Sequence, residues 1–433
     1  MSLSATLNLW PTQRYHTVDF RPPTFNVTKT GETQSGLIFI TPALRHINES
    51  SSKAAISAVG PIQTDAFGIF TEDGQLVWQG PHALRKEYTP DFGVVTRNFM
   101  AQYYMGKPVL TYRSGLGSNN GMGYGNITIL DDTYTPITTI CPKLGLLTPP
   151  SANLTDPIWF ADFHETPVGG PSLGYVYDSQ FYEIDIATGN IVFNWSSVAS
   201  EIPITYSELR PGVNSGTGLN SSDPFDWFRL NSISSVGDGY LINSRTCWTT
   251  WYLSSAGEIQ WQIEGNNTEG QSNFFVPEEA NFEWQHDARI SNNTNTSAVL
   301  RYFNNRNNEF SDRSVFNQSN GLRLSLNLVD KTLVVEKTLT DPAYRNFPNS
   351  QRSFGPLENG NTFIGWGAVA RLTEFGPDGD NVVRLRIQFG YDHAQSFRAY
   401  KQSWNATPFW NPDVVGLNDT AYMSWNGATD HTT

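Results

Sequence analysis

The chain has 433 residues and a net charge of −13, and only 16% of its residues are charged, against about 25% in a typical soluble domain. This acidic, weakly charged composition argues against nucleic acid as a partner, because phosphate binding requires a positive surface. No window approaches the roughly 18 consecutive apolar residues of a membrane span. With 38% hydrophobic and 13% aromatic residues, the chain is also too apolar to be disordered.

Short runs of β-branched and aromatic residues alternate with Gly, Pro, Asn and Asp, and no stretch has the apolar period of a helix. One pattern recurs: an apolar strand, a turn with Asp or Gly, and a second strand that often ends in an aromatic residue. Its six copies are residues 67–79, 125–137, 181–196, 251–262, 323–337 and 372–388. Further strands are expected at residues 108–113, 239–245, 298–304 and 360–368.

Four strands in each repeat of about 50 to 70 residues are typical of a β-propeller, whose blades bury their apolar faces against one another. We therefore predict an all-β fold, a six-bladed β-propeller formed by one domain, residues 1–433. Residues 1–30 are expected to be an N-terminal extension that packs on the propeller, and residues 412–433 a C-terminal tail. A tandem of β-sandwiches is the alternative, because the hairpin spacing is uneven. Three tryptophans that close hairpins are expected in the core between blades: Trp78, Trp195 and Trp261.

The sequons and cysteines bear on the cellular compartment. Many Asn-x-Ser/Thr sequons favour a secretory-pathway protein, extracellular or vacuolar, that carries N-glycans, although an Asn-rich chain also produces sequons by chance. The first four residues lack the charged and apolar regions of a signal peptide, so we expect the signal to have been removed. Cys141 and Cys247 are expected to form either one disulfide or two buried thiols. The sequons are at Asn26, Asn48, Asn126, Asn153, Asn194, Asn220, Asn266, Asn292, Asn295, Asn317, Asn405 and Asn418.

Several segments, in order along nearly the whole chain, resemble the fungal arylsulfotransferase-like family. The resemblance implies a six-bladed propeller of secretory proteins. Related bacterial arylsulfotransferases move a sulfuryl group between phenols through a histidine nucleophile, aided by further histidines and an arginine. Some fungal relatives resemble pericyclases that join a tropolone-derived quinone methide to a polyene. The segments are residues 9–16 (LWPTQRYH), 162–165 (DFHE), 183–196 (EIDIATGNIVFNWS), 226–232 (DWFRLNS), 242–246 (INSRT), 284–290 (WQHDARI), 357–368 (LENGNTFIGWGA) and 396–409 (SFRAYKQSWNATPF).

The family motif Asp-Trp-x-His-x-Asn-Ser appears here with Arg229 in place of its histidine, and a second common histidine is Thr246. These departures remove proton donors that sulfuryl transfer needs. Arginine offers fixed donors and a permanent charge, but it cannot shuttle protons. The resemblance implies the catalytic residues His286, Arg229, Arg245 and His164.

Each of these residues also has a structural alternative. His286 could be a hydrogen-bonded structural histidine, Arg229 and Arg245 could form salt bridges, and His164 with Glu165 could pack within a blade. Asp287 and Arg289 are expected to form an ion pair between blades, because residues i and i+2 share one face of a strand. Five residues are expected to bind substrate in the channel: Asn231, which shares a face with Arg229, and Trp248, Trp251, Trp284 and Trp366, which would form aromatic walls.

The favoured function is that of a natural-product pericyclase. It would catalyse an intermolecular hetero-Diels–Alder cycloaddition of a tropolone-type o-quinone methide with a humulene-type polyene in the central channel, where holding two reactants face to face supplies much of the acceleration. The first alternative is an aryl sulfotransferase with His286 as nucleophile, and the second is a non-catalytic secreted propeller that binds a ligand. The expected partners are small aromatic and terpenoid substrates, no cofactor or metal is expected, and a homo-oligomer is compatible with the sequence.

Overall fold

A computed structural model describes residues 10–18, 21–44, 67–80, 92–118, 123–140, 159–164, 174–200, 202–213, 215–266, 271–306, 318–348, 350–379, 381–391 and 394–429. Apart from two short 3-10 turns, η1 (Ile204–Tyr206) and η2 (Glu278–Ala280), all regular elements in these ranges are strands. None of the described residues forms a helix long and apolar enough to cross a membrane. The strands are β1 (Asn26–Lys29), β2 (Leu37–Leu44), β3 (Gly68–Phe70), β4 (Leu76–Gln79), β5 (Phe92–Tyr104), β6 (Lys107–Ser118), β7 (Gly123–Leu130), β8 (Pro136–Ile140), β9 (Trp159–His164), β10 (Gly174–Ile184), β11 (Ile191–Ser196), β12 (Leu230–Val236), β13 (Gly239–Ser244), β14 (Thr249–Leu253), β15 (Ile259–Glu264), β16 (His286–Ser291), β17 (Ser297–Asn304), β18 (Asn320–Asn327), β19 (Thr332–Leu339), β20 (Ser353–Pro356), β21 (Thr362–Gly365), β22 (Arg371–Phe375), β23 (Val383–Gln388), β24 (Ala394–Gln402), β25 (Asp413–Leu417) and β26 (Thr420–Ser424).

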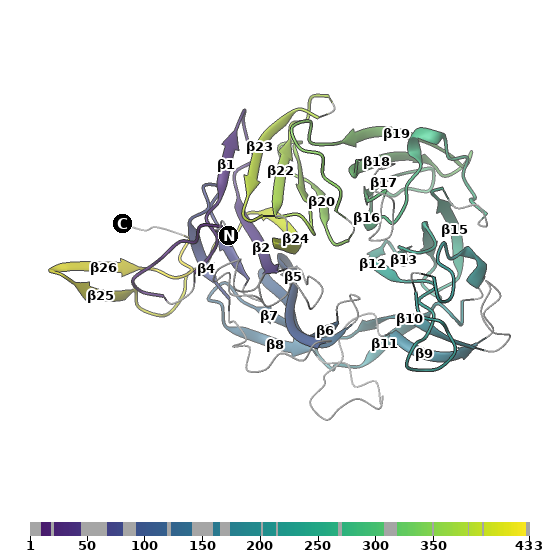
Figure 1. Cartoon of the computed structure of the whole chain (residues 1–433), viewed down its shortest axis with the longest axis horizontal. Helices are drawn as coiled ribbons and strands as arrows, with labels where there is room; N and C mark the ends of the chain where they lie inside the picture. The colour runs from purple at the N-terminus through teal and green to yellow at the C-terminus, as the bar shows by residue number, and fades with distance from the viewer. Residues whose placement is uncertain are drawn as a thin grey trace, which may run out of the picture.

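The sheets are arranged in a ring, which confirms the predicted all-β propeller (Figure 1). All six predicted hairpins are present, as β3–β4, β7–β8, β10–β11, β14–β15, β18–β19 and β22–β23. In the sheets of four or five strands, one edge strand lies nearest the centre of the ring and the other lies at its outside (Figure 1). The inner edge strands are β24, β5, β12, β16 and β20.

The prediction of six complete blades is wrong. Five sheets have four or five strands, whereas the described residues of the sector between β5–β8 and β12–β15 form the three-stranded sheet β11–β10–β9. The described residues between β11 and β12 add no fourth strand, and Phe225, directly after Pro224, makes an isolated parallel bridge with Val176 of β10.

The ring is closed by both ends of the chain. The C-terminal strand β24 pairs with β2, so that one sheet combines strands from both halves of the sequence. The N-terminal strand β1 adds a fifth strand to the sheet before it by pairing with β23. Lys401 and Glu374 form a fully buried ion pair of 2.6 Å across this junction.

The hydrophobic core consists of clusters between neighbouring sheets, as expected for radially stacked blades. The tryptophans Trp78, Trp195 and Trp261 are at most 6% exposed, which confirms their predicted core position. Trp78, for example, stacks on Tyr134 with ring centroids 4.3 Å apart. Cys247 is a fully buried thiol in one of these clusters, while Cys141 lies outside the described residues.

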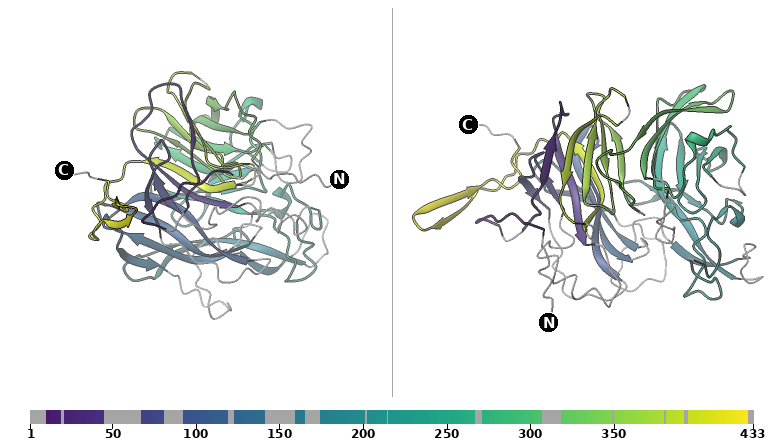
Figure 2. Two further views of the ribbon diagram at one scale, coloured as in Figure 1. Left: turned by 60° about the vertical axis from the view of Figure 1, so that its left-hand side comes forward. Right: turned by 45° about the horizontal axis from the view of Figure 1, so that its top comes forward.

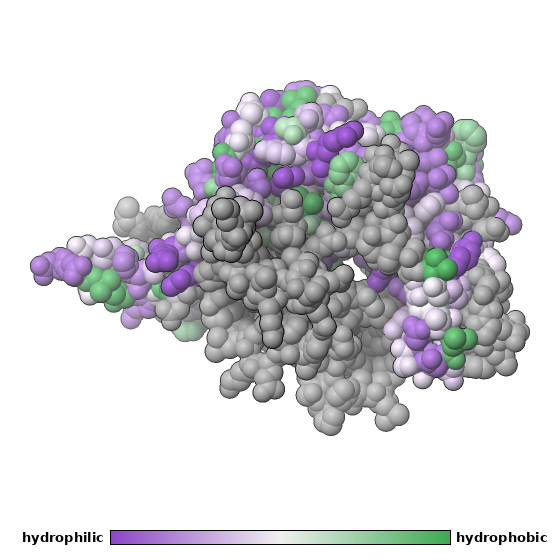
Figure 3. Space-filling view, viewed as in Figure 1, coloured by the Kyte–Doolittle hydropathy of each residue, from purple (hydrophilic) through white to green (hydrophobic). Residues whose placement is uncertain are grey.

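The hairpin β25–β26 projects from the ring (Figures 1 and 2). It contacts the N-terminal segment, where the rings of His16 and Tyr422 lie 3.8 Å apart. Apolar side chains are exposed on it, including Val414 and Met423 (Figure 3).

Candidate functional site

His286 is the first residue of β16, the inner strand of its sheet. Its Nδ1 lies 3.0 Å from the carbonyl oxygen of Trp284 and 3.1 Å from Oδ1 of Asn305. A carbonyl oxygen only accepts hydrogen bonds, so Nδ1 carries the proton and donates it. In the neutral ring, Nε2 therefore keeps its lone pair and can accept a proton.

The surroundings of His286 keep this ring neutral. Removal of the imidazole from water lowers the pKa of His286 well below 6.5, and the positive charges of Arg352 and Arg245 lower it further. The hydrogen bonds to Asn305 and Trp284 only partly oppose these effects. At neutral pH, His286 is thus an uncharged base beside two permanent cations.

Arg245 follows β13 and is only 4% exposed. Its guanidinium carbon lies 5.1 Å from the centroid of the Trp284 ring, in a cation–π contact. The Trp284 ring in turn meets Trp248 edge to face, with centroids 5.3 Å apart. Both tryptophans have positive φ values, 53° for Trp284 and 48° for Trp248. Such values are rare for bulky residues and occur preferentially at functional sites.

Arg352 was missed by the sequence analysis. It precedes the inner strand β20, is 1% exposed, and lies 4.5 Å above the ring of Phe303. The signal that could have found it is positional, because Arg229 likewise stands immediately before an inner strand, β12. We call His286, Arg245, Arg352, Trp248 and Trp284 together the His286 cluster.

Arg229 lies close to this cluster, since its carbonyl accepts a 3.0 Å hydrogen bond from the backbone N–H of Arg245. Its Nε is 3.1 Å from Oδ2 of Asp226. The salt bridge considered as the structural alternative is therefore present. Thr246, where the family has a histidine, is fully buried and donates a 2.6 Å hydrogen bond to the carbonyl of Trp227.

Asn231 uses both ends of its amide in a buried network. Its Nδ2 donates to the carbonyl of Gln285 at 2.6 Å, and its Oδ1 accepts from Asn243 at 2.7 Å. The side chain of Gln285 donates back to Oδ1 of Asn243 at 2.9 Å. Because Gln285 directly precedes His286, Asn231 acts on the site by positioning the start of β16.

Two of the four tryptophans expected to line the channel lie elsewhere. Trp251 and Trp366 are 0% exposed. Their indole N–H groups donate within their own sheets, to Gln262 at 2.8 Å and to Thr373 at 2.9 Å. A side chain without accessible surface borders no space for a ligand, so both are core residues.

His164 is the last residue of β9, in the three-stranded sheet. Its position is described only by its backbone, which pairs with Gly174. Its expected partner Glu165 lies outside the described residues. In the described part of the chain, no group of three or more His, Cys, Asp and Glu side chains could hold a metal ion.

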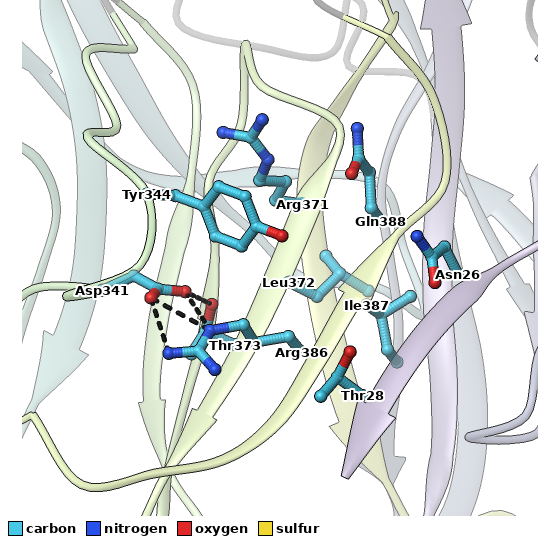
Figure 4. A pocket seen from close by; sticks show the side chains of 10 residues that line it. All are labelled: Asn26, Thr28, Asp341, Tyr344, Arg371, Leu372, Thr373, Arg386, Ile387 and Gln388. Carbon is cyan, nitrogen blue, oxygen red and sulfur yellow. Dashed lines mark hydrogen bonds and ion pairs between the residues drawn. The ribbon is translucent and has the colours of Figure 1, made fainter. Parts of the chain in front are cut away.

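A small groove on the sheet of β20–β23 is saturated by its own side chains (Figure 4). Asp341 holds Arg386 through Nε and NH2 at 2.9–3.0 Å, and Arg371 lies 4.4 Å above the ring of Tyr344. The groove has a volume of about 20 Å³, which has room for little more than one water molecule. The groove is therefore not a candidate substrate site.

Comparison with known proteins identifies the family. The sequence matches the family model described as Arylsulfotransferase (ASST) over residues 100–390. A comparison with curated proteins returns no match. Among solved structures, a protein of unknown function from Bacteroides caccae is similar at 10% identity and a TM-score of 0.41, covering 85% of this chain and 99% of that chain. A putative 6-phosphogluconolactonase from Bacteroides uniformis ATCC 8492 is similar at 10% identity and a TM-score of 0.36, covering 85% of this chain and 100% of that chain. The family match spans well over half of the sequence, and the chain belongs to the arylsulfotransferase family.

Proposed function

We propose that this family member is a pericyclase, which joins a tropolone-type o-quinone methide to a humulene-type polyene by hetero-Diels–Alder cycloaddition at the His286 cluster. The observation that carries the proposal is the arrangement of a permanent cation, Arg245, over an aromatic pair beside a neutral imidazole. At the two positions where the family motif has histidines, the chain has the ion-paired Arg229 and the buried Thr246. The site thus has more fixed hydrogen-bond donors than groups that can transfer protons.

The His286 cluster offers what a cycloaddition requires. The reaction needs two reactants held face to face, and orientation alone supplies effective molarities of about 10⁵ M or more. As the new bonds form unevenly, negative charge develops on the quinone-methide oxygen, where a guanidinium such as that of Arg245 stabilises it. The rings of Trp284 and Trp248 offer a wall for a flat conjugated reactant.

The tautomer of His286 bears on how the quinone methide would form. A ring that donates through Nδ1 and has a low pKa acts first as a base, not as an acid. If the quinone methide forms from an o-hydroxymethyl precursor, Nε2 accepts the ring hydroxyl proton. The proton then passes to the departing hydroxide, so that water is the only product besides the quinone methide.

Aryl sulfuryl transfer is the second candidate, and the same tautomer favours it. Nε2 of His286 would attack the sulfur atom while the bond from sulfur to the aryl oxygen breaks, with Arg245 and Arg352 balancing the negative charge. An acceptor phenol would then take the sulfuryl group from the histidine. This route requires a proton for the departing phenolate, which neither Arg229 nor Thr246 can supply.

Two parallel reactions followed by LC–MS distinguish the candidates. One contains an aryl sulfate with a phenol, and the other a hydroxymethyl-tropolone precursor with a humulene-type alcohol. A single stereoisomer of the cycloadduct, formed faster than with boiled protein, supports the proposal. Sulfated phenol above the boiled control overturns it in favour of the second candidate. Silence in both reactions overturns both and favours a propeller that only binds its ligand.

A further inference from the structure

A second site is suggested by a cavity of about 320 Å³, to which β16 contributes Asp287 and Arg289. Residues of the inner strands β5, β16, β20 and β24 line it, so it lies where four sheets meet. His286 and Asp287 are adjacent in sequence, but only Asp287 lines this cavity. The cavity is therefore separate from the His286 cluster.

Asp287 is contacted by groups from three sheets. Its Oδ1 is 2.9 Å from Arg289 on its own strand and 2.9 Å from Arg398 on β24. Its Oδ2 accepts a 3.1 Å hydrogen bond from the backbone N–H of Phe354 on β20. The predicted ion pair with Arg289 is thus present, but both residues lie on β16, so this pair does not join two blades as predicted. The contact of Asp287 with Arg398 on β24 is the one that joins two sheets.

Arg301 is the second guanidinium in the cavity wall, beside Arg289. Among the described residues, its one hydrogen bond runs from Nε to the carbonyl of Phe354 at 2.9 Å, and no carboxylate lies within ion-pair distance. Burial lowers the pKa of Arg301 to about 10, and the positive charges of Arg289 and Arg323 contribute to this. The cavity wall therefore carries two guanidiniums, those of Arg289 and Arg301, and a single carboxylate, that of Asp287, so that positive charge is in excess.

The remaining charges near the cavity neutralise one another. Lys401 is fully buried and contacts Glu374 at 2.6 Å and also Glu72. Glu72 in turn binds Lys29 at 2.9 Å. These two lysines and two glutamates leave the excess charge around Arg301 uncompensated.

The rest of the wall is largely apolar and aromatic. It includes Met100, Phe354, Leu357, Phe363 and the ring of Tyr400. Ligand pockets typically combine such walls with a few polar groups that fix orientation. A cavity of about 150 Å³ is sufficient for benzene, so this one has room for a substituted aromatic ring.

We infer that this cavity is a binding site for an aromatic oxyanion, which places its charged group at Arg301 and Arg289 and its ring against the apolar wall. The inference does not depend on which reaction occurs at the His286 cluster. It assigns this cavity a preference for organic anions over neutral molecules of the same shape.

Isothermal titration of the whole chain with benzoate, at constant ionic strength, tests this inference. Benzoate is expected to give saturable binding, and benzyl alcohol to bind at least about tenfold more weakly, as expected for loss of a charged hydrogen bond. Arg301→Met is expected to weaken benzoate binding about tenfold or more. Its matched control is Arg323→Met, one strand further out, which removes an arginine that pairs with Glu336 and does not line the cavity.

Gly355→Val gives an independent test that leaves every charge in place. A Cβ at Gly355 meets no atom within 4 Å, so the new side chain enters open space at the cavity wall and is expected to exclude benzoate. Gly416→Val, in equally open space on β25, is the control and is expected to bind normally. Absence of saturable binding to the native chain would overturn the inference, as would full binding by both Arg301→Met and Gly355→Val. Loss of binding in Arg245→Met alone would also overturn it, because the anion would then belong to the His286 cluster.

Discussion

His286 is expected to make the fold sensitive to acid. Its pKa in the folded protein is below the ordinary value of about 6.5, so near and below that pH the unfolded chain binds more protons than the folded one. The free energy of unfolding therefore decreases as the pH falls through 6.5. Urea unfolding at pH 7.5 and at about pH 5.5 should show a loss of about 1 kcal/mol or more that His286→Gln lacks. An identical pH dependence in both proteins would contradict the neutral imidazole.

Glu264 is expected to lower the stability of the fold at high pH, whereas His286 lowers it at low pH. Burial raises the pKa of its carboxyl to about 7, so the folded protein holds a proton that the unfolded chain has already lost above pH 4.5. The free energy of unfolding therefore decreases as the pH rises from about 4.5 to 7. Glu264→Gln keeps the hydrogen-bond acceptor and should stabilise the protein by about 1–3 kcal/mol at pH 8, with little effect at pH 4.5. Thermal unfolding at the two pH values checks this, and equal melting temperatures of variant and parent at pH 8 would refute it.

The sequence could identify His286 and Arg245 through motifs, but not the environment that gives them their chemistry. Arg352 is far from both in sequence and reaches the cluster only because the sheets close into a ring. The tryptophans show the same limit. Trp248 is partly buried, whereas Trp284 is 7% exposed and Trp251 and Trp366 are 0% exposed. This burial depends on packing between sheets and is not visible in the local pattern.

At the level of elements, hairpins could be predicted and inner strands could not. A hairpin has a local signal, alternating strands around a turn, and all six were found at their predicted positions. The sheet β11–β10–β9 has three described strands, although the repeat pattern predicts four in each blade. The closure by β24 and β2 joins residues more than 350 positions apart, as in the pair Ile38 and Lys401.

The closure makes a specific prediction about Lys401. Its ammonium and the Glu374 carboxylate are both fully buried, so removal of one charge leaves the other without compensation. Lys401→Met should lower the free energy of unfolding by about 3–5 kcal/mol. The double variant Lys401→Met with Glu374→Gln should recover part of that loss. Chemical denaturation measures both, and a single variant as stable as the parent would show that the pair does not hold the ring closed.

For the whole molecule, we propose passage through the secretory pathway with N-glycans on the propeller surface. Eight sequons are exposed, whereas Asn126 is partly buried and Asn48, Asn153 and Asn317 lie outside the described residues. The exposed sequons are those of Asn26, Asn194, Asn220, Asn266, Asn292, Asn295, Asn405 and Asn418. Protein expressed with a secretion signal in a eukaryotic host should lose mass on treatment with an amidase that removes N-glycans. Mapping of the deamidated asparagines should find the exposed sites. Unmodified asparagines at all eight exposed sequons would contradict this assignment.

The central claim is that the His286 cluster accelerates a cycloaddition, and the most direct test is the rate and stereochemistry of product formation in an Arg245→Met variant. Loss of a preorganised donor to the developing oxyanion should slow the reaction about 10²-fold. The Arg323→Met protein, which keeps the cluster intact, should match the native rate and form the same single stereoisomer. A native rate and native stereochemistry in Arg245→Met would contradict the account.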